Sequence, residues 1–423
     1  MNRSVLRCAV VLASLLVATD AGANDETPFA MSSEAAISGG AVMAAAQDVG
    51  STWYNPAAIA GVKRAETEVN GEAFGARLTR APGGDPFAAG SSVATPAGDS
   101  TEVLVVPTTI GQAFAVNDRW ALGLGVFAPV FGDAESAADE GGTYVRSRRT
   151  STRYHIGLLA GWQAHPDVRV GARAMVVYDE LRVQHRTFAD PAAGVTTFDG
   201  NASITTFGAE AALGVAARVH RMVQIGASLE TATFVLDQSS EGTRQTTDTD
   251  TMGTTVSFDR TPLPEAAGGQ LAGWRGAAGL QVGEGIWSAA TDAYLASKPG
   301  DRAEGVGWGL RLGGKVMVTK LMAVGGGTWI DRNIESDAGR GAFRGHRYGG
   351  ALGIDIVKPV RLAKGESAAT IEFRTTVAAR YAFETGTVGG RTRLERLLDD
   401  PERTRGNALR HVILLHVGTG LAF

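Results

Sequence analysis

The sequence predicts an all-β protein, a 14-stranded antiparallel transmembrane β-barrel with an N-terminal hatch (plug) inside its lumen. Three observations support this fold class: an apolar leader, long segments that alternate between apolar and polar residues, and connectors that alternate between short and long. The 423 residues carry 40 Lys and Arg against 44 Asp and Glu, for a net charge of −4. This balance argues against a nucleic-acid partner, which normally requires a basic excess.

Residues 1–23 have the organisation of an export signal. Arg3 and Arg7 provide a basic start, an apolar stretch follows, and Ala21-Gly22-Ala23 fits the cleavage rule, with Asn24 as the first mature residue. The alternative is an anchoring helix, but the apolar stretch is about half of the ~20 residues that a membrane helix requires. The single cysteine, Cys8, lies in this leader, so no disulfide or Cys-based metal site is expected.

Alternation dominates the chain from residue 65 to residue 423, the range predicted as the barrel. In Val306–Val318, one face holds Val306, Trp308, Leu310, Leu312, Val316 and Val318, and the other holds Arg311 and Lys315. Successive side chains of a strand point to opposite faces, so such a segment has one apolar and one polar face. Most of these segments reach 11 residues or more, which suits a tilted membrane strand better than a strand of a soluble protein.

The connectors between these segments alternate in length. Short ones are predicted at 117–119, 164–167, 220–222, 283–284, 319–321 and 357–366. Long loops are predicted at about 79–101, 132–145, 184–202, 237–265, 297–304, 331–345 and 385–406. Seven long loops and six short turns give 14 strands, with the short turns on the periplasmic side.

A large soluble β-sandwich also alternates and is the main alternative to the barrel. The length of the strands and the order of the connectors weigh against it, as does an apolar final strand that ends at Phe423. Glycine is abundant, with 56 residues, and barrel walls use glycine where they bend or leave room for a plug.

Residues 24–64 do not alternate, and a family resemblance implies that they form the hatch. The run Gly39–Gly61, with Asn55, Pro56 and Ala57 at its core, resembles the N-terminal signature of the FadL family. That family comprises outer-membrane transporters for long-chain fatty acids and other hydrophobic compounds. The resemblance implies a bacterial outer-membrane protein whose lumen is blocked by the hatch.

The segment Leu122–Gly132 resembles the third strand of the same family. The resemblance implies that a ligand leaves sideways through a gap where this strand kinks. Gly123 and Gly125 are predicted to loosen the strand, and Pro129 cannot donate to a ladder. Phe127, Pro129 and Phe131 are predicted to face the lumen, which suits a hydrophobic ligand, although inward Phe also occurs as packing against any plug.

Charged residues at other lumen-facing positions mix both signs. Pairing across neighbouring strands is the simplest interpretation, and binding of a ligand carboxylate is the functional one. Arg153, Arg173 and Arg311 lie in the middle of their strands and are the candidates for a head-group site.

The external loops depart from the family pattern. The loops at 184–202 and 237–265 are polar, so no apolar capture groove is expected outside, and long-chain fatty acid is not singled out as the ligand. The predicted function is passive uptake of hydrophobic small molecules, either fatty acid-like or hydrocarbon. The alternative is a non-transporting barrel of this family that anchors or shuttles secreted proteins at the cell surface.

No chemistry of an enzyme is predicted. The seven His form no metal motif, no Gly-x-Ser-x-Gly elbow exists, and a calcium-like run near Asp248 lacks the required ligands. We therefore expect no catalytic residue, no metal and no cofactor. The expected partners are outer-membrane lipid, lipopolysaccharide and the hydrophobic ligand, with the chain as a monomer.

Overall fold

The computed structural model describes most of the chain after the predicted leader. The described ranges are 29–44, 48–81, 98–140, 143–189, 194–250, 253–262, 270–297, 307–333, 343–361, 370–388 and 406–423. The predicted export signal at 1–23 lies outside these residues.

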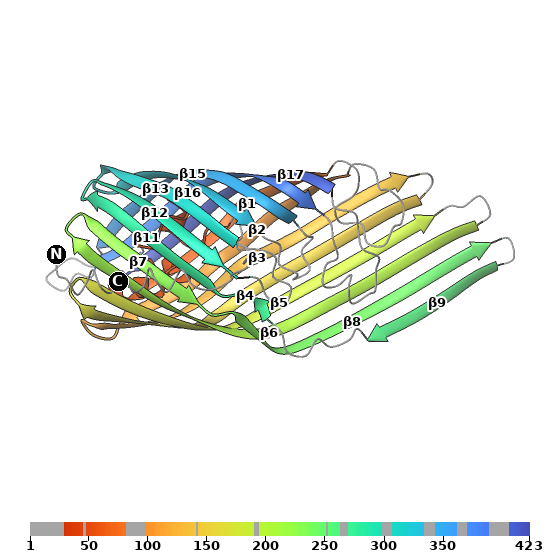
Figure 1. Cartoon of the computed structure of the whole chain (residues 1–423), viewed down its shortest axis with the longest axis horizontal. Helices are drawn as coiled ribbons and strands as arrows, with labels where there is room; N and C mark the ends of the chain where they lie inside the picture. The colour runs from red at the N-terminus through yellow and green to blue at the C-terminus, as the bar shows by residue number, and fades with distance from the viewer. Residues whose placement is uncertain are drawn as a thin grey trace.

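Fourteen strands form a closed antiparallel ring in the part of the chain that the structure describes (Figure 1). Each strand pairs with the next, and β17 pairs with β1. The strands are β1 (Glu66–Ala81), β2 (Gly98–Ala115), β3 (Trp120–Glu140), β4 (Thr143–His165), β5 (Val168–Ala189), β6 (Gly194–His220), β7 (Val223–Glu230), β11 (Arg275–Glu284), β12 (Trp287–Ala296), β13 (Gly307–Thr319), β14 (Met322–Asn333), β15 (Phe343–Arg361), β16 (Thr370–Val388) and β17 (Gly406–Ala422). The predicted fold class is confirmed.

Three further strands extend this wall. β8 (Thr233–Asp250) follows β7 and pairs with β6 beyond the ring, and β9 (Gly253–Pro262) returns along β8. The short β10 (Gln270–Ala272) pairs with β8 before β11 begins.

Alternation places apolar side chains on the outside of the barrel. On β13, Leu310, Leu312, Val316 and Val318 are exposed, as the sequence pattern predicts. In water such a surface would be unfavourable, whereas in a bilayer it meets lipid chains. Trp120 and Trp162 stack with ring centroids 5.9 Å apart on the outer surface, next to the β2–β3 turn. Aromatic residues of this kind mark the membrane–water interface of barrels.

No helix among the described residues is long and apolar enough to cross a bilayer.

The wall is much taller on one side than on the other. β4, β5 and β6 have 23, 22 and 27 residues, whereas β11 and β12 have 10 each. Figure 1 shows β3 to β6, with β8 and β9, running far beyond the end of β12 and β13. The long strands of the tall side project from the end of the barrel that lies opposite the short turns.

Three predicted loops are strands in the structure. Much of 132–145, 184–202 and 237–265 consists of paired strands that continue β3–β4, β5–β6 and β8–β9. A ladder is held by backbone hydrogen bonds, which do not require an apolar face, so a strand can continue after its apolar alternation has ended. The polar composition was correctly recognised, and the inference from it to a loop was wrong.

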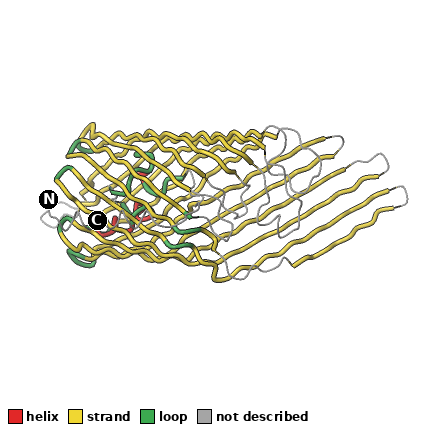
Figure 2. The backbone as a smooth tube through the Cα atoms, in the orientation of Figure 1, coloured by secondary structure: helices red, strands yellow, loops and turns green. Residues whose placement is uncertain are grey.

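The hatch lies inside the barrel near the end with the short turns (Figure 2). It contains the helix α2 (Ser33–Ile37) and the 3₁₀ helices η1 (Gly50–Trp53) and η2 (Pro56–Gly61). α2 contacts β13 to β17, and η2 contacts β3 to β6, so the hatch spans the lumen. Almost all of its described side chains are buried.

Candidate functional site

Asn55 links two segments of the hatch to each other and to the barrel wall. Its side-chain oxygen accepts a hydrogen bond from the N–H of Ala57 at 3.0 Å and so caps η2. Its amide nitrogen donates to the carbonyls of Met43, at 2.7 Å, and of Val215 on β6, at 3.1 Å. The residue is fully buried. The Asn-Pro-Ala core is therefore the point where two parts of the hatch and the barrel meet.

Two glycines of the wall allow this close approach. A Cβ atom added at Gly214 would overlap Asn55, and one added at Gly171 would overlap the backbone of Pro56. A larger residue at either position would push η2 away from the wall.

Acidic side chains of the wall bind backbone N–H groups of the hatch. Asp292 Oδ2 accepts hydrogen bonds from the N–H groups of Val42 and Met43, at 2.6 and 2.8 Å. Glu68 Oε2 accepts one from the N–H of Gly50, the first residue of η1, at 2.7 Å. A buried N–H group without a partner costs free energy, so these acidic side chains hold both parts of the hatch in place.

A network of ion pairs anchors α2 at one side of the barrel. The Glu34 carboxylate lies 2.7 Å from Lys315 Nζ and 3.2 Å from Arg374, which also pairs with Asp355 at 2.9 Å and with Asp48 at 3.6 Å. Burial raises the pKa of Glu34, but Lys315 and Arg374 outweigh it and hold the pKa below its ordinary value. The hatch is thus fixed by charge as well as by packing.

The ladder between β2 and β3 is interrupted. Thr109 pairs with Phe127, and Thr101 pairs with Glu135, but no pair in the described register joins residues 128–134 to β2. The register is the same on both sides of the interruption, so the strands part and meet again without a slip. On the β4 side, the register shifts by one residue between Phe127 and Val130, as in a β-bulge.

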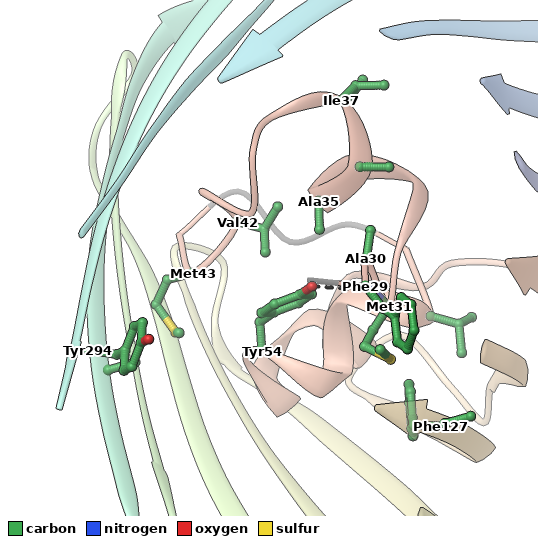
Figure 3. Close-up of a cluster of buried hydrophobic side chains, with 14 of the residues drawn as sticks. Phe29, Ala30, Met31, Ala35, Ile37, Val42, Met43, Tyr54, Phe127 and Tyr294 are labelled. Atoms are coloured by element: carbon green, nitrogen blue, oxygen red, sulfur yellow. Dashed lines mark hydrogen bonds between the residues drawn. The ribbon is translucent and has the colours of Figure 1, made fainter. Parts of the chain in front are cut away.

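The bulge turns three consecutive side chains toward the interior. Ala128, Pro129 and Val130 are all buried, so strict alternation fails where the predicted kink lies. Phe127 is fully buried, and Phe131 packs partly against the same core. Figure 3 shows Phe127 beside Phe29 and Met31 of the hatch.

Gly123 and Gly125 have a packing role at this point. A Cβ atom at Gly125 would overlap the Phe127 ring, and one at Gly123 would overlap Ile59 of η2 and the Gln112 carbonyl. The two glycines therefore make room for an aromatic ring and for the hatch. The sequence-based interpretation gave them only a loosening role.

A lumen pocket lies between the hatch and the surrounding wall, with lining residues from β3 round to β16. The empty space of about 700 Å³ at this place includes open solvent. Its lining combines aromatic rings, cationic groups, acidic groups and the bulge of β3. These are Phe29, Trp53, Tyr54 and Trp329; Arg153, Arg275, Arg311 and Arg380; Glu210, Glu230 and Asp331; and Pro129 and Val130.

Guanidinium groups stack on aromatic rings around this pocket. The guanidinium carbon of Arg380 lies 4.8 Å from the Trp329 ring centre, and that of Arg311 lies 5.2 Å from Tyr294. Such stacking stabilises a buried cation without using up its N–H donors. Arg380 Nε and Nη1 and Arg153 Nη2 have no hydrogen-bond partner among the described residues.

The three arginines singled out from the sequence have different environments. Arg153 lines the pocket and pairs with Asp179 at 2.8 Å, and Arg311 also lines it. Arg173 does not. It pairs with Glu230, donates to the Thr52 and Trp53 carbonyls and stacks on the Trp53 ring at 4.7 Å. Its role is to hold the hatch.

Sequence reasoning did not single out Trp53, Arg275 or Arg380 as site residues. Trp53 contacts Phe127 with ring centroids 5.3 Å apart, and it meets the edge of His155 at 4.9 Å. Alternation places Arg380 inward, but nothing in the sequence brings it close to a residue on another strand.

The comparisons with known proteins address the family directly. A family model described as outer membrane protein transport protein (OMPP1/FadL/TodX) matches residues 12–236, a little more than half of the chain. The chain belongs to the FadL family. It is therefore an outer-membrane transport protein of the barrel type and not an enzyme. No curated protein sequence shows a significant match.

Solved structures agree in fold. A FadL homologue of Pseudomonas aeruginosa superimposes with a TM-score of 0.61 at 13% identity, covering 96% of this chain and 100% of that one. The Pseudomonas putida toluene transporter TodX gives 0.59 at 13% identity, with 95% and 99% coverage. The Ralstonia pickettii toluene transporter TbuX gives 0.56 at 11% identity, with 94% and 99% coverage. At these identities, the likeness establishes the fold alone.

No group of His, Cys, Asp and Glu suited to a metal ion occurs within the ranges that the structure describes.

Proposed function

We propose that this protein takes up hydrophobic small molecules passively across the outer membrane. The ligand enters the lumen from outside, pauses in the pocket beside the hatch and leaves sideways between β2 and β3. The observation that carries the proposal is that Pro129 and Val130 line the lumen pocket and also lie within the interruption of the β2–β3 ladder. In this proposal, these two residues lie on the path from the pocket to the membrane interior.

The chemistry of the pocket favours an amphipathic ligand over a pure hydrocarbon. Rings such as Trp53 and Trp329 suit an apolar or aromatic body, and the donors left open on Arg153 and Arg380 suit a carboxylate. Two similar structures are described as toluene transporters, whose ligand carries no charge. An aromatic or alkyl carboxylic acid is the ligand class that uses both parts of this lining.

Uptake by a deletion strain tests the ligand class. Cells complemented with this chain should accumulate radiolabelled benzoate or octanoate faster than cells without it, and faster than they accumulate toluene. Arg380→Met keeps most of the side-chain volume beside the Trp329 ring but removes the charge. This variant should take up less benzoate and octanoate, with no change in the uptake of toluene. Equal uptake of benzoate, octanoate and toluene by complemented and uncomplemented cells would contradict transport.

Cross-linking tests the lateral exit. Cysteines at Val105 and Phe131 would face each other if the β2–β3 register continued through the interruption. A disulfide requires Cα atoms within about 7 Å, so this pair should stay reduced, whereas the paired control Ile110→Cys/Val126→Cys should oxidise readily. Bridging the first pair with a longer bifunctional reagent should then reduce uptake. Rapid disulfide formation at the first pair would show that no opening exists there.

We also propose that the barrel acts as a monomer in contact with outer-membrane lipid and lipopolysaccharide. Every strand of the ring has a partner on both sides over part of its length, so the wall itself needs no second copy. Its exposed apolar side chains suit a lipid surround.

Anchoring of a secreted protein is the second candidate function. One observation favours it: the tall, polar extension formed by β4, β5, β6, β8 and β9 rises well beyond the opposite side of the barrel. Co-purification of one surface protein, together with unchanged uptake of the hydrophobic panel, would support this role over transport.

A further inference from the structure

A second pocket lies at the end of the barrel that carries the short turns, where the hatch meets β4 to β7. It is lined by basic and amide side chains: Lys63, Arg169 and Arg218, with Gln163 and Gln224. It contains one acidic lining residue, Asp167. The pocket thus carries three positive charges against one negative charge, and it is separate from the lumen pocket described above.

The strand register explains why these side chains meet. Gln163 of β4 pairs directly with Arg169 of β5, and Arg218 of β6 pairs directly with Gln224 of β7. Directly paired residues share a face of the sheet, so all four point toward the same interior. The Arg218 N–H donates to the Asp167 carbonyl at 2.8 Å, which ties β6 to the β4–β5 turn.

The hatch completes the pocket from the other side. A Cβ atom at Gly61 would overlap the guanidinium of Arg169, so that group lies against the end of η2. Lys63 follows directly, and its Nζ donates to Gln163 Oε1 at 2.6 Å. The Gln163 amide nitrogen in turn donates to the Pro166 carbonyl at 3.1 Å.

The two arginines have no acidic counterpart among the described residues. Neither forms an ion pair there, and Asp167 instead lies 3.8 Å from Nδ1 of His165. Two unpaired guanidinium groups side by side repel one another, and an oxyanion between them removes that repulsion. Guanidinium forks match the geometry of carboxylate and phosphate oxygens.

We propose that this pocket is an oxyanion-binding site at the periplasmic mouth of the barrel. Its ligand is a carboxylate or a phosphate held by Arg169 and Arg218, with Lys63 adding charge. The anion comes either from an organic acid in the lumen or from phosphate in the periplasm. The site stands on its own geometry and does not depend on which molecule the barrel transports.

Binding to the full-length protein in detergent tests this site, with inorganic phosphate and octanoate as separate probes in titration calorimetry. At least one probe should bind saturably, and Arg169→Gln/Arg218→Gln should weaken it at least tenfold. The matched control is Arg221→Gln, because Arg221 is exposed at a turn and lies 3.9 Å from Glu284. Heat-modifiable migration on a gel verifies that each variant is folded.

The pattern of binding identifies the source of the anion. Binding of phosphate alone identifies a phosphate site, and binding of octanoate that Arg169→Lys weakens identifies a carboxylate site that needs the planar fork. Absence of saturable binding by either probe at millimolar concentration would overturn the proposal. Equal binding by the double variant and by the wild type would overturn it as well.

Discussion

At the scale of single residues, the contact between hatch and wall depends on small groups in fixed places. Asn55 satisfies two carbonyls and one N–H at a fully buried position, and no other residue type presents both donors and an acceptor at that length. Gly171 and Gly214 contribute by having no side chain. The Asn-Pro-Ala motif therefore holds the hatch against the wall. The groups available for a ligand lie elsewhere, around Trp53 and Arg380.

Replacing Asn55 with Ala should loosen the hatch while leaving the barrel folded. Two buried carbonyls and the Ala57 N–H lose their partner, at a cost of roughly 1–3 kcal/mol in local stability. Hydrogen exchange followed by mass spectrometry should show faster exchange over 48–64 and unchanged exchange in β4 to β6. The control is Asn117→Ala, because the Asn117 side chain accepts hydrogen bonds from the N–H groups of Arg119 and Trp120 within the exposed β2–β3 turn. Equal protection of 48–64 in both variants would contradict the role of Asn55.

At the scale of elements, the hatch and strand β3 depend on each other. Phe127 occupies the space that Gly125 leaves, and Gly123 leaves space for Ile59, so the bulged strand and η2 fit together. The ion pairs of α2 lie across the lumen, with Lys315 on β13 and Arg374 on β16. The hatch is thus held at two sides by different forces, packing near the proposed exit and charge opposite to it.

The charged side of this arrangement predicts a dependence on pH. The ion pairs hold the pKa of Glu34 below its ordinary value. At pH values above that ordinary pKa, the Glu34 carboxylate therefore contributes its full stabilisation to the seated hatch. This contribution is lost as the pH falls through the lowered pKa. Hydrogen exchange of α2 should therefore accelerate in acid, after correction for the intrinsic rate, and in Glu34→Gln it should be fast already at neutral pH.

The control for this experiment is Glu372→Gln, which removes a half-exposed ion pair with Arg64 on the same side of the barrel. Surface pairs contribute about 0–1 kcal/mol, so exchange of α2 should barely change in that variant. An identical pH response in the wild type and in Glu34→Gln would rule out Glu34 as the titrating anchor.

At the scale of the whole molecule, the sequence predicted the wall better than its contents. The face of each strand follows from the two-residue period, because one face must meet lipid and the other must not. The strand number follows from the order of short and long connectors, and closure follows because lipid leaves no partner for an open edge. The tall extension was missed, since Thr-rich hairpins with water on both sides do not alternate. The pocket was missed in part, because Trp53, Arg275 and Arg380 come from three distant segments and only the closed ring brings them together.

The extension itself gives the last prediction. Replacing Glu241–Pro262 by a short turn removes β9 and most of β8 but leaves every pair of the 14-stranded ring, so the barrel should still fold. A transporter whose ligand pauses beside Trp53 and leaves near Pro129 should keep its uptake rate, because this path lies below the removed hairpin. An anchoring protein should lose its surface partner. Uptake of labelled octanoate and co-purification from the same cells separate the two functions, and a folded variant with lost uptake would show that the extension captures the ligand.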